Sequence, residues 1–280
     1  MGRTRSPARI VFVAWNVALL GWAVLAATRG ELGVSLLAEL ALAWFAVATV
    51  GVVFPGLEMY GPIVQRGPAG RRSVALTFDD GPHPVTTRRI LAALAGTRHR
   101  ATFFVLGVKA RRHPDVLREI QAAGHTIGVH GDEHDRLHSF RMPWRVYGDL
   151  VRAAKAVEDA TGVRPHLFRP PLGHTSVNAA PGVRRAGLTV VGWSVRGLDG
   201  MRTQTPEAVV TRVERELSDG AIVMLHDASE RDDYEPASIR ALPELLRLLD
   251  ERGWTSVGVD TLLAHATDRT TERSAALALR

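Results

Sequence analysis

The sequence contains no cysteine among its 280 residues, and this excludes a disulfide framework, a zinc finger and a thiol nucleophile. Any metal ion must therefore be held by histidine, aspartate or glutamate. With 46% hydrophobic and 23% charged residues, the composition also excludes a disordered chain. The net charge of +6 favours anionic partners such as a membrane surface or nucleic acid. We expect no nucleic-acid partner, because no basic stripe with interleaved aromatic residues is present.

Charged residues are absent from two long apolar runs near the N-terminus, Ile10–Thr28 and Leu40–Leu57. A helix that crosses a bilayer needs roughly 20 apolar residues. The two runs therefore predict a transmembrane hairpin within residues 1–59, with membrane lipid as a partner and a short loop at Arg29–Val34. The alternative is a signal peptide followed by one buried core helix, because small residues follow the first run and arginines precede it.

Arginines lie outside both ends of this hairpin, at Arg3, Arg5 and Arg9 before it and at Arg66, Arg71 and Arg72 after it. Such a distribution predicts that both ends face the cytoplasm of a bacterial-type inner (plasma) membrane. Cleavage of the first segment would place the following domain outside instead.

The remaining chain divides into three parts. Glycine and proline make residues 60–70 a predicted linker. Residues 71–265 alternate short apolar runs with amphipathic stretches and form the predicted main domain. Residues 266–280 carry charges without a period and form a predicted C-terminal tail. No pattern predicts an obligate protein partner.

This main domain is predicted to belong to the α/β class, because seven short apolar runs alternate with helical patterns. Their continuous apolar character suits parallel strands buried on both faces. About seven strand–helix units over this length predict a distorted (β/α) barrel. The predicted strands are Val74–Phe78, Ala101–Val105, Thr126–Val129, His166–Phe168, Thr189–Trp193, Ala221–Leu225 and Ser256–Val259.

Titratable or cationic side chains follow five of these strands. In α/β barrels the active site forms at the C-terminal ends of the strands, so side chains that are distant in sequence share one rim. The convergence predicts a single site from Asp79, Asp80, His130, His134, Arg169, Asp199 and His226.

His130 and His134 are four residues apart, a spacing that lets two imidazoles reach one ion. A third ligand from Asp79 or Asp80 completes a His₂-carboxylate set with positions left for water. Such a set suits zinc or another borderline divalent ion. Of the two adjacent carboxylates, one would bind the metal and the other would accept a proton.

Five ordered motifs resemble those of the polysaccharide deacetylase family, the NodB-homology domain of carbohydrate esterase family 4. The resemblance covers about residues 71–263. It implies a distorted (β/α) barrel, one divalent metal ion (zinc, with cobalt, nickel or manganese as alternatives) and hydrolysis of an N-acetyl group from an amino sugar in a glycan. The motifs are Thr77–Gly81, Gly124–His130 with His134, Arg169–Gly173, Trp193–Asp199 and Met224–Asp227.

Roles follow from this resemblance residue by residue. Asp80, His130 and His134 would bind the metal. Asp79 would be the general base, held by Arg169, and His226 would be the general acid, oriented by Asp199. Pro171, Leu172 and Met224 would lie at the substrate, with the Leu172 N–H helping to hold the oxyanion.

The sequence departs from the family pattern at positions that shape the substrate site. Gly131 stands where the family has serine or threonine, and Leu172 where it has an aromatic residue. Arg196 replaces an acid and Gly200 replaces a tryptophan, while Met224 replaces leucine with little change in volume. The resemblance thus predicts an active enzyme whose sugar or acyl group differs from the usual one.

Three functions are consistent with these observations. The first is a membrane-anchored, metal-dependent hydrolase that removes the N-acetyl group of peptidoglycan, a chitooligosaccharide or a related glycan. The second is a deacylase or deformylase of a lipid-linked amino sugar at the membrane. The third is a catalytically inactive glycan-binding barrel, which the presence of every expected ligand and catalytic residue disfavours.

Overall fold

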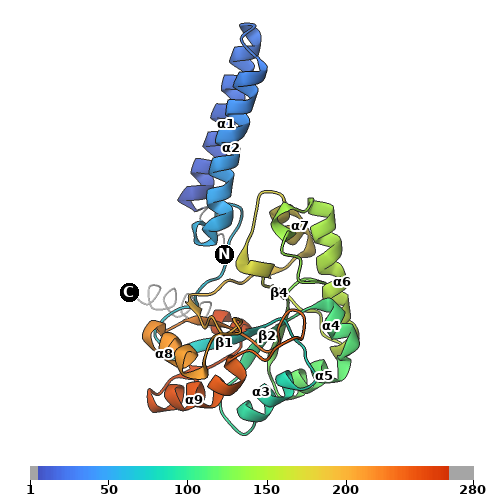
Figure 1. The fold of residues 1–280 in the computed structure, drawn as a ribbon, viewed down its shortest axis with the longest axis vertical. Helices are drawn as coiled ribbons and strands as arrows, with labels where there is room; N and C mark the ends of the chain where they lie inside the picture. The colour runs from blue at the N-terminus through green and yellow to red at the C-terminus, as the bar shows by residue number, and fades with distance from the viewer. Residues whose placement is uncertain (1–5, 265–280) are drawn as a thin grey trace, which may run out of the picture.

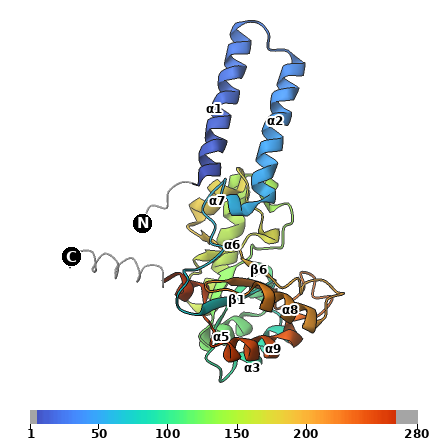
Figure 2. The same cartoon turned by 90° about the vertical axis from the view of Figure 1, so that its left-hand side faces the viewer.

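The computed structural model describes residues 6–264, in which a long helical hairpin projects from one end of an α/β barrel. Figure 1 shows the hairpin above the barrel, and Figure 2 shows its two helices side by side. The C-terminal tail predicted for residues 266–280 lies outside the described residues.

The hairpin consists of α1 (Pro7–Thr28) and α2 (Val34–Val53). Both helices are long and apolar enough to cross a membrane, with mean hydropathies of 2.2 and 2.1, and only 11% of either apolar window is buried. Trp44 of α2 donates a hydrogen bond to Asn16 of α1 over 2.9 Å. The two helices therefore contact each other while most of their apolar surface stays uncovered by protein.

The base of the hairpin packs against the barrel through a small apolar cluster. Tyr60 follows the short helix η1 (Pro55–Leu57) and lies edge-on to Phe12, with ring centroids 5.4 Å apart. Its hydroxyl donates to the carbonyl of Ala48, and Val177 and Ala180 of the barrel complete the cluster. Side chains from both helices thus meet the catalytic domain at one point.

The barrel wall is a sheet in which all the paired strands of the described chain run parallel. Seven strands follow the order β5-β4-β3-β2-β1-β7-β6, and β8 pairs with the start of β1. This arrangement confirms the predicted α/β barrel. The strands are β1 (Ser73–Asp79), β2 (Ala101–Val105), β3 (Thr126–Val129), β4 (Leu167–Phe168), β5 (Thr189–Val190), β6 (Val195–Arg196), β7 (Ile222–His226) and β8 (Thr255–Ser256).

Helices follow most of the strands and cover the outside of the barrel. Gly162 ends α6 in the left-handed conformation at φ +73°, and the Thr205 hydroxyl caps α8 by accepting from the Ala208 N–H. The helices are α3 (Thr86–Leu94), α4 (Gly107–Arg112), α5 (Pro114–Ala122), α6 (Pro143–Thr161), α7 (Ala179–Ala186), α8 (Pro206–Glu216) and α9 (Ser238–Glu251), with 3₁₀ turns η2 (His138–Phe140) and η3 (Pro171–Gly173).

The segment predicted as a linker pairs with the residue that follows β5 and with the residue that precedes β7. Val64 forms a parallel bridge with Val191, and Arg66 forms an antiparallel bridge with Ala221. Ile63 is buried beside them. Residues 60–70 therefore form part of the barrel wall, because their backbone groups satisfy edge hydrogen bonds that no neighbouring strand reaches.

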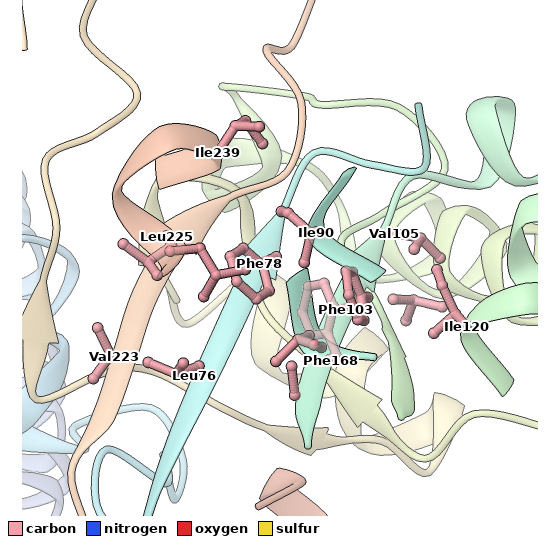
Figure 3. Packing of buried hydrophobic residues seen from close by; sticks show 14 of the residues in the cluster. Leu76, Phe78, Ile90, Phe103, Val105, Ile120, Phe168, Val223, Leu225 and Ile239 are labelled. Carbon is pink, nitrogen blue, oxygen red and sulfur yellow. The ribbon is translucent and has the colours of Figure 1, made fainter. Parts of the chain in front are cut away.

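Alternation along β1 explains why an apolar strand leads to a polar site. Val74, Leu76 and Phe78 point toward the helices and join the large outer core, which Figure 3 shows around Phe78 and Phe103. Successive side chains of a strand point to opposite faces, so Thr77 and Asp79 point into the barrel. The strand thus delivers a carboxylate to the barrel interior while its other face holds the fold together.

Several strand predictions differ in detail from the structure, and the predicted strand Ser256–Val259 is observed as β8 at Thr255–Ser256. The predicted strand Thr189–Trp193 is shorter, because Val191 and Gly192 pair with Val64 instead of extending β5. Strand β6 had no prediction of its own, since its two residues give no periodicity.

Candidate active site

The predicted site residues converge at the carboxyl ends of β1, β3, β4 and β7. Asp79 ends β1 and Asp80 follows it, His130 follows β3, Arg169 follows β4, and His226 ends β7. The register pairs Asp79 directly with His226 on neighbouring strands. Segments separated by almost 150 residues in the chain are therefore adjacent at this rim.

Asp80, His130 and His134 form one compact group whose potential ligand atoms all lie within 4.8 Å of one another. Asp80 Oδ1 is 3.6 Å from His130 Nε2 and 3.8 Å from His134 Nε2. These separations leave room for an ion that each atom would approach at about 2.0–2.2 Å.

The His130 ring is oriented by its second nitrogen. Nδ1 donates to the carbonyl of Arg169 over 2.8 Å, which leaves Nε2 with a free lone pair toward Asp80. Burial and the neighbouring His134 hold the pKa of His130 well below its ordinary value. A buried, neutral imidazole with a fixed lone pair is the form that binds a metal ion.

The Asp80 carboxylate indicates whether a cation fits between Asp80, His130 and His134. Asp80 Oδ1 is buried and has no hydrogen-bond partner, and a buried charged oxygen without a partner is costly. Desolvation by burial raises the pKa of Asp80, with His226 and His134 acting in the opposite direction. A divalent cation between the three side chains would satisfy this oxygen, so the residues present fit a metal ion.

Glu230 is a neighbour of this group that the sequence patterns did not identify. Its Oε2 lies 3.4 Å from His134 Nδ1 and accepts a 2.7 Å hydrogen bond from Arg136. Within the described residues His134 Nδ1 has no hydrogen-bond partner, so Glu230 acts on this ring through its nearby negative charge. Glu230 lies 96 residues away from His134 in the chain, and no local motif signals the contact.

Asp79 is held on the opposite side by a buried arginine. Arg169 is fully buried, and its Nη1 donates to Asp79 Oδ1 over 2.8 Å and to Thr77 Oγ1 over 2.7 Å. Its Nη2 donates to the carbonyl of Gly192 over 2.9 Å, and its guanidinium carbon lies 4.2 Å from the Phe104 ring centroid. Burial raises the pKa of Asp79, and the Arg169 charge opposes that rise.

His226 is fixed by Asp199, as the resemblance implied. Its backbone N–H donates to Asp199 Oδ2 over 2.8 Å, and its Nδ1 lies 3.1 Å from Asp199 Oδ1. Burial lowers the pKa of His226, but the carboxylates of Asp199, Asp80 and Asp79 outweigh burial and raise it to about 10. The ring is therefore protonated at neutral pH in this arrangement and can donate a proton.

Asp80, His134 and His226 open onto a pocket of about 440 Å³, which we call the metal-site pocket. Leu172 and Met224 line it together with Asp80, His134 and His226, whereas Pro171 is buried beneath Leu172. Leu172 adopts a left-handed conformation at φ +57° with half of its surface exposed. The structure thus places two of the three predicted substrate residues on the pocket surface.

Two departures from the family pattern have a local physical cause. Gly131 has φ +102°, a conformation that side chains disfavour, and a Cβ there would approach the Glu133 carbonyl oxygen to 2.9 Å. At Gly200 a Cβ would lie 3.0 Å from His226 Cε1. Tyr234, which the sequence did not single out, donates to the Gly200 carbonyl and lines the pocket on that side.

Comparisons with known proteins agree with the motif pattern. Residues 66–191 match the family described as polysaccharide deacetylase. A chitooligosaccharide deacetylase of Bradyrhizobium sp. (strain ANU 289) is 35% identical over 195 residues, which cover 66% of this chain and 88% of that protein. A peptidoglycan-N-acetylglucosamine deacetylase of Bacillus cereus is 31% identical over 212 residues, covering 75% of this chain and 96% of that protein.

The fold agrees as well. The solved structure of peptidoglycan deacetylase PdaC from Bacillus subtilis superposes with a TM-score of 0.65 at 28% identity. The match covers 73% of this chain and 96% of that one. The hairpin contributes little to it, since the matched share of this chain is about the length of the barrel.

Proposed function

Since the chain belongs to the polysaccharide deacetylase family, whose members are hydrolases of carbon–nitrogen bonds in N-acetyl amino sugars, we propose that it is a membrane-anchored, metal-dependent N-deacetylase of a glycan. The observation that carries the proposal is the placement of Asp79 and His226 beside the Asp80, His130 and His134 group. A base and an acid next to one cation-binding group are the requirement for hydrolysing an amide.

Asp80, His130 and His134 would hold the metal ion, for which we propose zinc because the donor set is two imidazoles and a carboxylate. When bound, such an ion polarises the acyl carbonyl and makes water a better nucleophile. Side chains of this protein carry out the proton transfers of the reaction.

The Asp79 carboxylate accepts a proton from the attacking water, whose oxygen bonds to the acyl carbon. Arg169 keeps that carboxylate in place through the 2.8 Å hydrogen bond. His226 then donates its proton to the sugar nitrogen as the carbon–nitrogen bond breaks, so that acetate and a free amine leave. Asp199 keeps the His226 ring in the orientation that this transfer needs.

The anchor in this proposal is the hairpin. At 1.5 Å per residue, 22 and 20 helical residues extend about 33 and 30 Å, which matches the roughly 30 Å hydrocarbon core of a bilayer. Exposed apolar side chains such as Val17 and Leu42, 66% and 70% exposed, support lipid as their surroundings. A buried core helix, the alternative for α2, would carry its apolar side chains inside the barrel.

The proposed orientation of the hairpin in the membrane follows from the arginines that flank it. Arginines outside both helix ends support a cytoplasmic barrel, whereas relatives that act on peptidoglycan support the opposite side. We propose the cytoplasmic side, because the positive residues at Arg66, Arg71 and Arg72 lie close enough to the second helix to influence its insertion.

The mechanism is tested by Asp79→Asn in the detergent-solubilised full chain. Asparagine keeps the shape and can still accept from Arg169, so the variant should retain its metal and lose kcat for acetate release by at least ~10²-fold. Asp159→Asn is the matched control, because Asp159 is exposed on α6 and pairs with Lys155. Acetate release by Asp79→Asn at the rate of the Asp159→Asn control would exclude Asp79 as the base.

A further inference from the structure

A second cavity of about 220 Å³ lies beside the metal-site pocket, on the side of the membrane hairpin. This second cavity is lined by Val53 at the end of α2, by Pro55, and by Trp193. Leu172 and Arg196 line both cavities. We call the two neighbouring cavities together the hairpin groove; their linings extend from Val53 at the end of a candidate membrane span to the candidate metal ligands Asp80 and His134.

The outer mouth of the groove lies at the level where lipid phosphates are found. Helix α2 is 20 residues long and so about 30 Å in length, the thickness of the hydrocarbon core. If α2 spans that core, its last residue, Val53, marks the boundary between acyl chains and head groups. Figures 1 and 2 both show this end of α2 directly beside the barrel.

Arg196 offers a cation at the junction of the two cavities. It is exposed, and among residues 6–264 no carboxylate oxygen lies within 4 Å of its guanidinium group. Its guanidinium carbon lies 5.5 Å from the Trp193 ring centroid, and that ring packs against Gly173, where a Cβ would approach it to 2.2 Å. The indole is thus held in place and positions the arginine over the groove.

The strand register gives the distance between Arg196 and His226. Arg196 pairs with Met224, two residues before His226 on the neighbouring strand. A strand separation of about 4.8 Å and a rise of about 3.3 Å per residue place the Cα atoms of Arg196 and His226 about 8 Å apart. A 2-amino sugar carries its amide and its anomeric substituent on adjacent carbons, so with the amide at His226 an anomeric phosphate lies within reach of the long Arg196 side chain.

Charge at this position also differs from the family pattern, which has an acid where Arg196 stands. Replacing a carboxylate by a guanidinium reverses the preference at the junction from cations to anions. Phosphate is the anion for which a planar, multiply donating guanidinium is best suited.

Building on the proposed deacetylase function, we propose that the substrate is an N-acylated amino sugar joined through phosphate to a long-chain lipid. The sugar lies in the metal-site pocket, the phosphate contacts Arg196, and the lipid chain leaves past Val53 and Pro55 toward the bilayer. Hydrolysis adds water across the amide, releases the carboxylic acid, and leaves the sugar phosphate and its lipid intact.

The test compares three substrates with the zinc-loaded full chain in detergent: N-acetylglucosamine linked by phosphate to farnesol, N-acetylglucosamine 1-phosphate, and chitotetraose. We expect kcat/KM for release of acetate to be at least tenfold higher for the farnesyl compound than for either soluble substrate. Equal values for the farnesyl compound and the free 1-phosphate would overturn the lipid assignment. Chitotetraose as the best substrate would overturn the whole inference and leave the proposed deacetylase function standing.

Arg196→Gln isolates the phosphate contact. Loss of a charge-assisted hydrogen bond should raise KM for the farnesyl compound about 10- to 100-fold and change KM for chitotetraose less than threefold. Arg240→Gln, at an exposed position of the outer helix α9, removes the same charge away from the groove and should alter neither value. An equal loss on both substrates in Arg196→Gln would overturn the phosphate contact. Absence of acetate release from all three substrates would instead overturn the proposed function.

Discussion

Replacing Arg169 by methionine should destabilise the barrel far more than any surface arginine replacement. Arg169 is 0% exposed and gives hydrogen bonds to Asp79, Thr77 and the Gly192 carbonyl. Methionine fills most of the volume but leaves the Asp79 carboxylate buried without its cation. Breaking a buried pair in this way costs about 3–5 kcal/mol, because the remaining charge is neither hydrated nor compensated.

At about 2–4 °C per kcal/mol for a domain of this size, the Arg169→Met variant should lose about 6–20 °C in Tm. Differential scanning fluorimetry of the full chain in detergent measures this loss. Arg164→Met is the matched control, because the Arg164–Glu158 pair is exposed and contributes about 1 kcal/mol or less. Acetate release should also fall by at least ~10²-fold, since an uncompensated Asp79 takes up a proton and cannot act as the base.

A second substitution separates the unpaired charge from lost packing. Adding Asp79→Asn to Arg169→Met removes the buried charge and should raise Tm above that of the single variant. A Tm for Arg169→Met no lower than that of Arg164→Met would refute the reasoning. So would a double variant less stable than Arg169→Met, because packing would then account for the whole loss.

Three further outcomes are expected. Either His130→Ala or His134→Ala should remove most of one divalent metal per chain, and full metal in both variants by elemental analysis would exclude the assigned site. Alkaline phosphatase fused after Gly70 should be inactive if the barrel is cytoplasmic, and an active fusion there reverses the topology. Burial lowers the pKa of His138 to about 4, below its ordinary 6.5. The neutral buried ring therefore contributes fully to the stability of the fold above pH 6.5, and this contribution is lost as the pH falls toward 4. His138→Phe should therefore lose less Tm between pH 7 and pH 4.5 than the wild type, and equal losses would show that His138 is not the sensitive group.

The sequence by itself determined the barrel and the membership of its rim. The buried strands β1, β2, β3 and β7 are continuous apolar runs, so local composition is enough to identify them. Because parallel strands end at one rim, the residues that follow them must meet, whatever the loops do. The length and the apolar composition of the two hairpin runs likewise predict two long helices.

The family resemblance assigned Asp80 to the metal, but only the tertiary structure shows why two adjacent carboxylates take different places. Continued strand alternation would point Asp80 away from the barrel interior that Asp79 faces. Instead, the backbone turns at Asp80, with φ +75°, and brings its carboxylate to the two histidines. A single left-handed residue has no signature in composition or periodicity, so the sequence left Asp79 and Asp80 equivalent as ligands on spacing alone.

Contacts between distant segments were equally out of reach of sequence patterns. Glu230 reaches His134, Val64 closes the barrel beside β5, and the end of α2 joins the groove that contains Arg196. Each depends on loops that share no periodicity with their partners, and their positions are set by packing across the whole domain. Motif spacing therefore determined the chemistry at the centre of the site, whereas tertiary packing determined what surrounds it and which substrates can reach it.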